Sequence, residues 1–406
     1  MSSLQLPETA RATTGRTGSD LWPTLLCWIA VALDGFDLVV LGAVIPTISK
    51  SGALGFTNSS LTVASTVGLI GVGIGAVTIG PLADRFGRRK SLISSIAVFS
   101  VLTIAVAFAP NVSTFIALRF LAGLGLGACL PTALAFMTEF ARPGRGGSAV
   151  TRMMTGYHVG AVLTALLALW LVDAYGWESM FIVGGVAGLL TLPIMWAKLP
   201  ESETYLRADT RKSTPVDVVR GKYLRISIGL WLASFMGLLL VYGLNTWLPK
   251  IMGEAGYSIR AGTGLLLVLN VGAVIGLLIA GAISDSRGNK PTVLAWFGLA
   301  AVFLALLSIK MNSSLVVYAA VLLTGIFVFS AQVLVYAFVG QLYPAQIRGT
   351  ALGMAAGVGR VGAIVGPSIG GAMVTAGIAY PWGFYGFAIA ALLAVVALAT
   401  VPARVT

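Results

Sequence analysis

Apolar residues dominate this chain in long runs, and short polar segments separate one run from the next. Twelve of these runs reach the ~20 residues that a helix needs to cross the hydrocarbon core of a bilayer. The alternating pattern of membrane-barrel strands is absent. The chain is therefore predicted to be an all-α membrane protein, with transmembrane helices at residues 22–48, 60–82, 91–110, 113–138, 148–172, 179–198, 224–250, 261–283, 291–309, 314–340, 350–376 and 382–402.

Composition agrees with the pattern of apolar runs. Of the 406 residues, 57% are hydrophobic and 10% are charged, and the mean hydropathy is +0.94. So few charges cannot cover the surface of a soluble protein of this size. Residues 1–20 are polar and lack the apolar core of a cleavable signal peptide, so we expect them to form a cytoplasmic tail.

The formal net charge of +12 reflects membrane topology rather than a nucleic-acid partner. With the N-terminus in the cytoplasm, 19 of the 26 Lys and Arg residues fall in cytoplasmic segments. Four fall outside, at Lys50, Lys250, Arg260 and Lys310, and three fall within helices, at Arg119, Arg152 and Arg360. This asymmetry follows the positive-inside rule and predicts that both termini are cytoplasmic.

One long polar stretch, ESETYLRADTRKSTPVDVVRGKYLR at 201–225, divides the chain in the middle. The predicted domains are therefore a tail at 1–20, a six-helix bundle at 21–198, a cytoplasmic linker at 199–223, a second six-helix bundle at 224–402 and a tail at 403–406. Two related bundles that face each other are typical of transporters, with the substrate site between them near the middle of the membrane.

An internal repeat relates the two halves. GPLADRFGRRK at 80–90 returns as GAISDSRGNKP at 281–291, which sets Asp84 against Asp285 at an offset of 201. Segments 145–161 and 348–363 also resemble each other and set His158 against Arg360. The repeat therefore predicts two pseudo-symmetric bundles.

GPLADRFGRRK is a candidate gating loop at the cytoplasmic end of the second helix. Gly80 allows close helix approach, Asp84 can cap or pair with the N-terminus of a neighbouring helix, and Arg88 can hold a carboxylate, for which Glu139 is placed. Such contacts would stabilise one conformation of a two-state transporter. The alternative is a basic loop that serves topology alone. The gating candidates are Gly80, Asp84, Arg85, Gly87, Arg88 and Glu139.

Two acids, Asp34 and Asp37, lie within the apolar stretch ALDGFDLVVLGAVIP at 32–46. An acid at bilayer depth costs at least ~2.5–3.5 kcal/mol, so it usually pairs, faces water or does chemistry. Three residues apart, the two acids project from one face of a helix. Burial favours the neutral form of a carboxyl group, which suits an acid that takes up and releases a proton. The alternative is a structural pair with Arg119 or Arg152.

Arg360 is the leading candidate for binding a substrate carboxylate, because a guanidinium matches that anion in bidentate geometry. Arg119 is a second candidate. Alternatively, Arg360 is a buried partner for another acid or a helix dipole. His158 either relays a proton or bonds a substrate hydroxyl, or else is satisfied between helices. Other polar side chains offer hydrogen bonds or a ring face to an aromatic ligand, or else join helices: Gln332, Tyr336, Asn245, Trp247 and Asn270.

The motifs resemble those of a known group of transporters. GPLADRFGRRK is similar to the loop signature of the major facilitator superfamily, and DGFD followed by an apolar run into IP resembles the first helix of its aromatic acid/proton symporter family. RFLAGLGLGACLP at 119–131 and YPAQIRGTALGMAAGVGRVGAIVGP at 343–367 also resemble that family. The superfamily resemblance covers the whole chain.

The resemblance implies a monomeric carrier in the bacterial inner membrane. It would import a small aromatic carboxylate, such as benzoate or a hydroxybenzoate, with protons by alternating access. The proton gradient would supply the energy, with no cofactor and no metal. Both acids of the first helix are regarded as needed for transport in that family, and this role carries over to Asp34 and Asp37.

Three other functions are less well supported. A proton-driven exporter of this superfamily carries a GPxxGG-like motif in its fifth helix, whereas GPSIGG at 366–371 lies in the eleventh span here. A transporter-derived sensor usually adds a long cytoplasmic tail or loop. An enzyme would need a nucleotide-binding loop, metal cluster or nucleophile, and the sequence contains no convincing candidate.

Overall fold

The computed structural model describes residues 21–202, 214–257 and 259–404. The predicted tail at 1–20, residues 203–213 of the predicted linker, residue 258 and residues 405–406 lie outside the described residues. Twelve helices in the described part are long and apolar enough to cross a membrane. The first six are α1 (Leu21–Ser51), α2 (Asn58–Phe86), α3 (Arg88–Ala107), α4 (Val112–Phe140), α5 (Gly146–Tyr175) and α6 (Glu178–Lys198).

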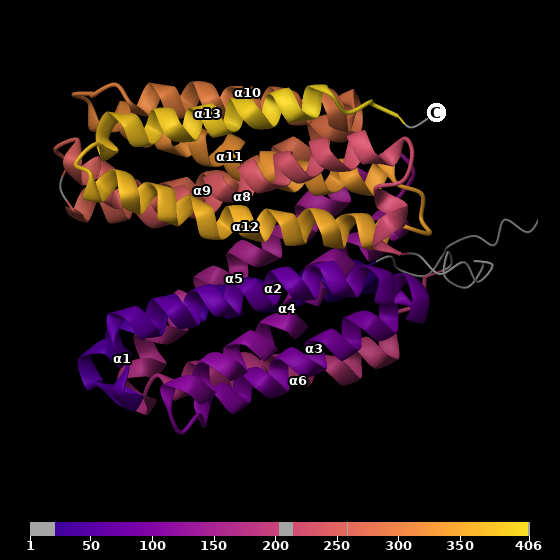
Figure 1. Cartoon of the computed structure of the whole chain (residues 1–406), viewed down its shortest axis with the longest axis horizontal. Coiled ribbons are helices and arrows are strands. Elements are labelled where there is room, and N and C mark those ends of the chain that lie inside the picture. The colour runs from indigo at the N-terminus through magenta and orange to yellow at the C-terminus, as the bar shows by residue number, and fades with distance from the viewer. Residues whose placement is uncertain (1–20, 203–213, 258, 405–406) are drawn as a thin grey trace, which may run out of the picture.

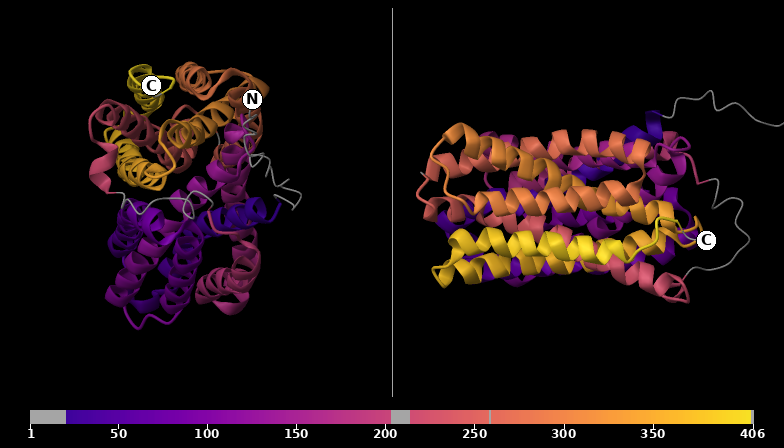
Figure 2. Two further views of the ribbon diagram at one scale, coloured as in Figure 1. Left: turned by 90° about the vertical axis from the view of Figure 1, so that its right-hand side faces the viewer. Right: turned by 90° about the horizontal axis from the view of Figure 1, so that it is seen from above.

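The second six are α8 (Tyr223–Glu254), α9 (Ile259–Arg287), α10 (Asn289–Leu307), α11 (Ser314–Leu342), α12 (Arg348–Thr375) and α13 (Ala379–Ala399). Two short 3₁₀ helices, η1 (Ala53–Gly55) and η2 (Pro215–Val218), precede α2 and α8. Figure 1 shows α1–α6 and α8–α13 as two bundles, and the end-on view in Figure 2 separates them again. The predicted fold of two six-helix bundles is confirmed.

The internal repeat is visible in backbone geometry. Gly87, between α2 and α3, has φ 97°, and Gly288, between α9 and α10, has φ 90°, a region that glycine enters without steric cost. The hydroxyl of Ser91 donates to the carbonyl of Gly87 at 2.8 Å, and that of Thr292 donates to the carbonyl of Gly288 at 2.7 Å. The same turn is therefore built twice at an offset of 201 residues.

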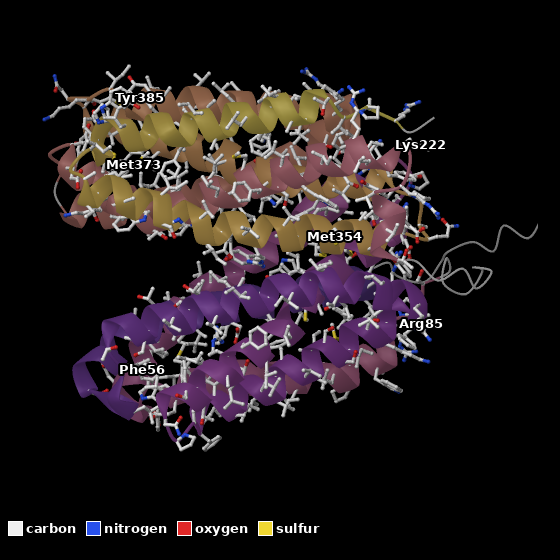
Figure 3. The ribbon with its side chains drawn as sticks, viewed as in Figure 1. Phe56, Arg85, Lys222, Met354, Met373 and Tyr385 are labelled. Carbon is white, nitrogen blue, oxygen red and sulfur yellow. The ribbon has the colours of Figure 1, made fainter. Side chains whose placement is uncertain are left out.

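The bundles are in contact at one end of the molecule and separate toward the other. Arg85 and Lys222 lie at the first end, here called the basic end, and Phe56 lies at the opposite end (Figure 3). Near the basic end α2 packs closely on α12, where a Cβ on Gly80 would lie 2.5 Å from Cα of Thr350. Toward the opposite end a cleft of about 590 Å³ runs between α1 and α2 on one side and α8 and α12 on the other. The bundles are therefore joined across the basic end, where a separate surface pocket of about 620 Å³ lies beside Thr138, Asp285 and Gln341.

Candidate functional site

A cavity of about 60 Å³ lies between the two bundles, beneath the cleft. Side chains of both bundles form its wall, most of them apolar. This volume is well below the ~150 Å³ of a cavity known to bind benzene, so the cavity must widen to admit an aromatic ring. The lining residues are Asp34, Leu130, Met154, Tyr157, His158, Leu238, Val241, Tyr242, Phe329, Gln332, Val333, Tyr336 and Arg360.

Asp34 enters the cavity from α1 and is 1% exposed. Neither of its carboxylate oxygens has a hydrogen-bond partner among the described residues. Its ion-pair partner is Arg360 of the other bundle, with Oδ2 and Nη2 4.0 Å apart. That distance is too long for a hydrogen bond, so the pair is held by charge alone. The Asp34 carboxylate can therefore accept a proton, or a hydrogen bond from a ligand.

Arg360 reaches the cavity from a glycine-rich part of α12. A Cβ on Gly359 or Gly362 would collide with α8, so glycine lets the two helices approach closely beside the arginine. The guanidinium Nη1 donates to the hydroxyl of Tyr242 at 2.7 Å. It is therefore oriented from its own bundle, by α8, while its charge faces the acid of the other bundle.

Tyr242 and Tyr157 were not predicted as site residues. Their hydroxyls approach each other from α8 and α5, across the two bundles. Tyr242 lines both the central cavity and the cleft above it, so its side chain lies between the two spaces. Tyr157 lies in the repeated segment 145–161, next to the candidate His158, whereas only its place within a membrane span could have suggested Tyr242.

Asp37, by contrast, is fully paired inside the first bundle. Nη1 of Arg119 in α4 donates to both carboxylate oxygens at 2.9 and 3.1 Å, and the hydroxyl of Thr103 in α3 donates at 3.1 Å. Nη2 of Arg119 donates to the backbone carbonyl of Asp37 at 3.3 Å. The predicted placement of Arg119 at the substrate is therefore corrected. Arg119 lies outside the cavity lining, because Asp37 already engages it. Arg152, the other arginine suggested as a structural partner, is exposed.

His158, Gln332 and Tyr336 lie in the cavity wall, as expected of substrate contacts. The His158 ring packs against Phe329 at 5.6 Å between centroids and lies close to Asn270. Gln332 donates from Nε2 to the hydroxyl of Ser234 at 3.3 Å. These residues add polar groups to the cavity wall beside Asp34 and Arg360.

Three other predicted ligand contacts serve helix packing instead. Nε1 of Trp247 donates to the carbonyl of Pro367 at 2.6 Å and so joins α8 to α12. Asn270 of α9 donates to the side-chain oxygen of Asn245 in α8 at 3.2 Å. Trp247, Asn245 and Asn270 are absent from the cavity lining. They correspond to the helix-joining alternative, because the apolar bilayer makes such polar groups bond each other.

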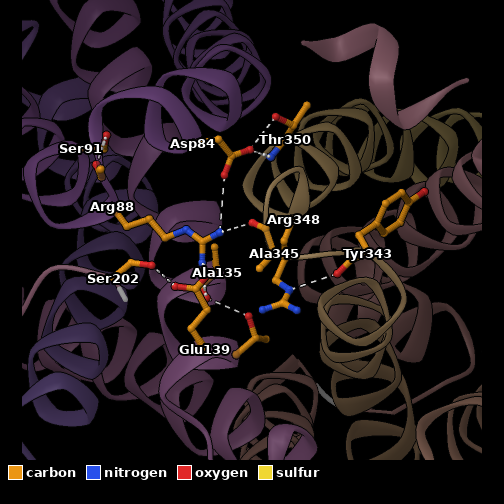
Figure 4. A network of polar contacts seen from close by, with 12 residues as sticks. Asp84, Arg88, Ser91, Ala135, Glu139, Ser202, Tyr343, Ala345, Arg348 and Thr350 are labelled. Carbon is orange, nitrogen blue, oxygen red and sulfur yellow. Dashed lines mark hydrogen bonds and ion pairs between the residues drawn. The ribbon is translucent and has the colours of Figure 1, made fainter. Parts of the chain in front are cut away.

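The predicted gating loop forms a polar network at the basic end (Figure 4). Asp84 accepts from the backbone N–H of Thr350 at 3.0 Å and from its hydroxyl at 2.8 Å, at the start of α12. Arg88 forms an ion pair with Glu139 and donates to the carbonyl of Ala345 at 2.8 Å. Asp84 and Arg88 thus both join the first bundle to the second at this end.

The remaining loop candidates differ in their roles. Gly87 supplies the turn described above, and Gly80 supplies the close approach to α12. Arg85 is exposed and packs its guanidinium 4.9 Å from the ring of Phe86, outside the network. The structure therefore does not bring Arg85 together with the other gating candidates.

The second copy of the loop makes the reciprocal contact. Asp285, at the end of α9, accepts from the backbone N–H of Ser148 at 3.2 and 3.3 Å, near the start of α5. Each bundle thus places one aspartate at the N-terminus of a helix in the other, where the helix dipole favours a carboxylate. The repeat identified Asp285 as the equivalent of Asp84, but not its partner.

Comparison with known proteins agrees with this architecture. The model of the Major Facilitator Superfamily matches residues 27–277 and 261–406. The gentisate transporter of Corynebacterium glutamicum is 36% identical over 95% of this chain and 88% of its own length. The 4-hydroxybenzoate transporter PcaK of Pseudomonas putida is 31% identical over 93% of this chain and 90% of its own length.

A solved structure shares the fold at lower identity. The proton:xylose symporter XylE matches with a TM-score of 0.77 over 93% of this chain and 94% of that chain, at 19% identity. The findings confirm the family resemblance that the motifs indicated and exclude an enzyme. The chain belongs to the Major Facilitator Superfamily and is a multi-pass membrane transporter.

Proposed function

We propose that this transporter imports a small aromatic carboxylate together with protons across the bacterial inner membrane by alternating access, and that it works as a monomer. The names of the relatives, a gentisate and a 4-hydroxybenzoate transporter, support the substrate class. A small apolar cavity that contains a guanidinium suits an aromatic ring with one carboxylate.

The observation that carries the proposal is the loose pair of Asp34 and Arg360, 4.0 Å apart in the cavity. An ionised Asp34 attracts the guanidinium and competes with a substrate carboxylate for it. Protonation of Asp34 removes this competition, so Arg360 becomes available to the substrate. Proton and anion therefore bind best together, which is the requirement for symport.

The charges that move set the driving force. One proton carried with one carboxylate moves no net charge, so the pH gradient alone would drive uptake. Each further proton would add about 2.3 kcal/mol per 100 mV of interior-negative potential. The basic loops support a cytoplasmic location for the basic end and both termini. The cleft between the bundles then faces the outside.

Alternating access would exchange this state for one that is closed at the opposite end. The contacts of Asp84 with Thr350 and of Asp285 with Ser148 join the bundles at the basic end and would have to break. The two-bundle fold permits such a rocking motion around a central site.

Uptake into proteoliposomes tests the proposal. We expect labelled 4-hydroxybenzoate or gentisate to accumulate with an inward proton gradient and a protonophore to abolish accumulation. Asp34→Asn should lose gradient-driven accumulation but keep exchange of labelled for unlabelled substrate, because the neutral amide leaves Arg360 available. Asp173→Asn changes an exposed acid of α5 and should transport normally. Accumulation that persists with the protonophore would contradict proton coupling.

A further inference from the structure

Gln332 has an unused hydrogen-bond acceptor in the cavity wall. The side chain extends from α11 and the residue is 3% exposed. Its Oε1 atom has no hydrogen-bond partner among the described residues. A buried acceptor without a donor costs ~1–3 kcal/mol, so such groups in native proteins call for an explanation.

The hydrogen bonds of Ser234 determine which atom of the Gln332 amide has no partner. The hydroxyl of Ser234 donates to the carbonyl of Ala355 at 2.8 Å. A hydroxyl has one proton, so toward Gln332 the oxygen can only accept. Gln332 must therefore present Nε2 to Ser234, at 3.3 Å, and Oε1 remains the free acceptor. The hydroxyl of Tyr336 contacts both Gln332 and Ser234, and Oε1 of Gln332 still has no hydrogen-bond partner among the described residues.

Glycine at residue 237 makes room for this oxygen. A Cβ at Gly237 in α8 would collide with Oε1 of Gln332. VIPTI at 44–48 in α1 returns as WLPKI at 247–251 in α8, an offset of 203 residues that also sets Asp34 against Gly237. The second bundle thus presents an amide oxygen at the position where the first bundle presents a carboxylate. The two groups require different partners: one pairs with a cation or a proton, and the other needs a hydroxyl or N–H donor.

Apolar side chains that line the cavity together with Arg360 and Gln332 suit an aromatic ring. Phe329 lies one turn before Gln332 on α11, and Leu238 and Val241 line the same cavity from α8. A ring packed against these side chains, with its carboxylate on Arg360, carries its ring substituents toward the remaining wall. Benzoate has only C–H groups there, whereas a hydroxybenzoate has a donor.

We propose that Oε1 of Gln332 accepts a hydrogen bond from a ring hydroxyl, so that the site selects hydroxylated aromatic acids over benzoate. This inference rests on the proposed function, because it assumes that Arg360 holds the carboxylate. A site that bonds a substrate hydroxyl rejects the analogue that lacks it, since the buried acceptor is then left unpaired. Gln332 is thus a specificity-determining residue.

The test measures the ratio of kcat/KM for hydroxybenzoate to that for benzoate in proteoliposomes. For wild type we expect a ratio of about ten or more with 3- or 4-hydroxybenzoate. Gln332→Met removes the acceptor and should lower the ratio about tenfold. Gly237→Ala leaves the amide but displaces its oxygen, so it should lower the ratio too. Gln341→Met makes the same change at an exposed position on the same helix and should leave the ratio unchanged.

Several outcomes overturn the inference. It fails if benzoate is preferred in wild type, if Gln332→Met keeps the wild-type ratio, or if Tyr336→Phe alone abolishes the preference. If Gln332→Met does not fold, as judged by thermal unfolding in detergent, the ratio for Gly237→Ala decides. Failure of the proposed function looks different, because no aromatic acid would then accumulate in response to a proton gradient.

Discussion

Asp34 and Arg360 face each other across the two bundles at 4.0 Å, whereas Asp37 and Arg119 lie 2.9 Å apart within one bundle. The two acids are three residues apart on α1, yet their surroundings differ. A contact between bundles is exposed to any motion of one bundle against the other. A pair within one bundle moves as part of a rigid body. The geometry therefore separates Asp34, the acid that we propose for proton coupling, from Asp37, which holds α1 to α4.

Loss of one partner of the inner pair should destabilise the protein. Asp37→Asn leaves the charge of Arg119 buried without a counter-charge, which typically costs ~3–5 kcal/mol. We expect a clear fall in the temperature of unfolding in detergent. Replacing both partners, with Asp37→Leu and Arg119→Met, should restore most of the loss, because no charge then remains unpaired. A double variant whose loss equals the sum of the losses from Asp37→Leu alone and Arg119→Met alone would contradict the pairing.

Apolar runs predicted the membrane helices and the repeat predicted the two bundles, because both depend on composition and local pattern. The partners within the membrane could not be predicted in the same way. Asp34 and Asp37 look alike in sequence, and only the packing of α4 on α1 decides that Arg119 bonds one of them. Likewise, Trp247 bonds the carbonyl of Pro367 because of a helix crossing that its neighbours in sequence do not reveal.

The sequence predicted that an aspartate would contact the N-terminus of a helix, but it did not predict which helix. The sequence of the loop indicated that Asp84 would cap a neighbouring helix, and the structure supplies α12. The hydroxyl contact of Tyr157 with Tyr242 had no local signal at all. It arises where the two bundles meet. Along the chain, the end of α5, all of α6, the linker and the first part of α8 separate the two tyrosines.

Removing the charge of Asp84 or Asp285, the two aspartates that cap helices of the opposite bundle, should open the basic end. Asp84→Asn and Asp285→Asn each remove a charge from the N-terminus of a helix, worth ~0.3–2 kcal/mol. We expect each to raise the population open at this end by about two- to thirtyfold, and the double variant to raise it further. The labelling rate of a cysteine at Thr138→Cys, which faces Gly340 of the other bundle, reports this opening.

The labelling experiment needs two controls. The natural cysteines, Cys27 and Cys129, are buried and can be replaced by alanine to give a clean background. A cysteine at Ser286→Cys is exposed in the closed structure, so its labelling rate should not respond to the aspartate variants. Unchanged labelling at Thr138→Cys in the double variant would argue that the aspartates do not hold this end closed.

A bulky residue at Gly80 should prevent the basic end from closing. In the structure, a Cβ at Gly80 would lie 2.5 Å from Cα of Thr350 and 2.7 Å from the carbonyl oxygen of Gly349. Backbone atoms cannot yield as a flexible side chain does, so Gly80→Val should hold the bundles apart here. We expect loss of uptake and faster labelling at Thr138→Cys. Gly42→Val, at a position with no neighbour within 4 Å, should transport normally.

Tyr242→Phe should weaken substrate binding, because it removes the hydroxyl that accepts from Arg360 at 2.7 Å. Without it the guanidinium is free to turn toward Asp34 and is less available to a substrate carboxylate. A hydrogen bond to a charged group is worth ~1.5–3 kcal/mol, so the KM for uptake should rise about tenfold or more. The ring itself remains between the cavity and the cleft, so kcat should change much less. Tyr385→Phe alters a tyrosine of α13 that is 39% exposed, and should leave KM unchanged. A fall in kcat at constant KM would instead assign Tyr242 to the conformational change rather than to orientation of Arg360.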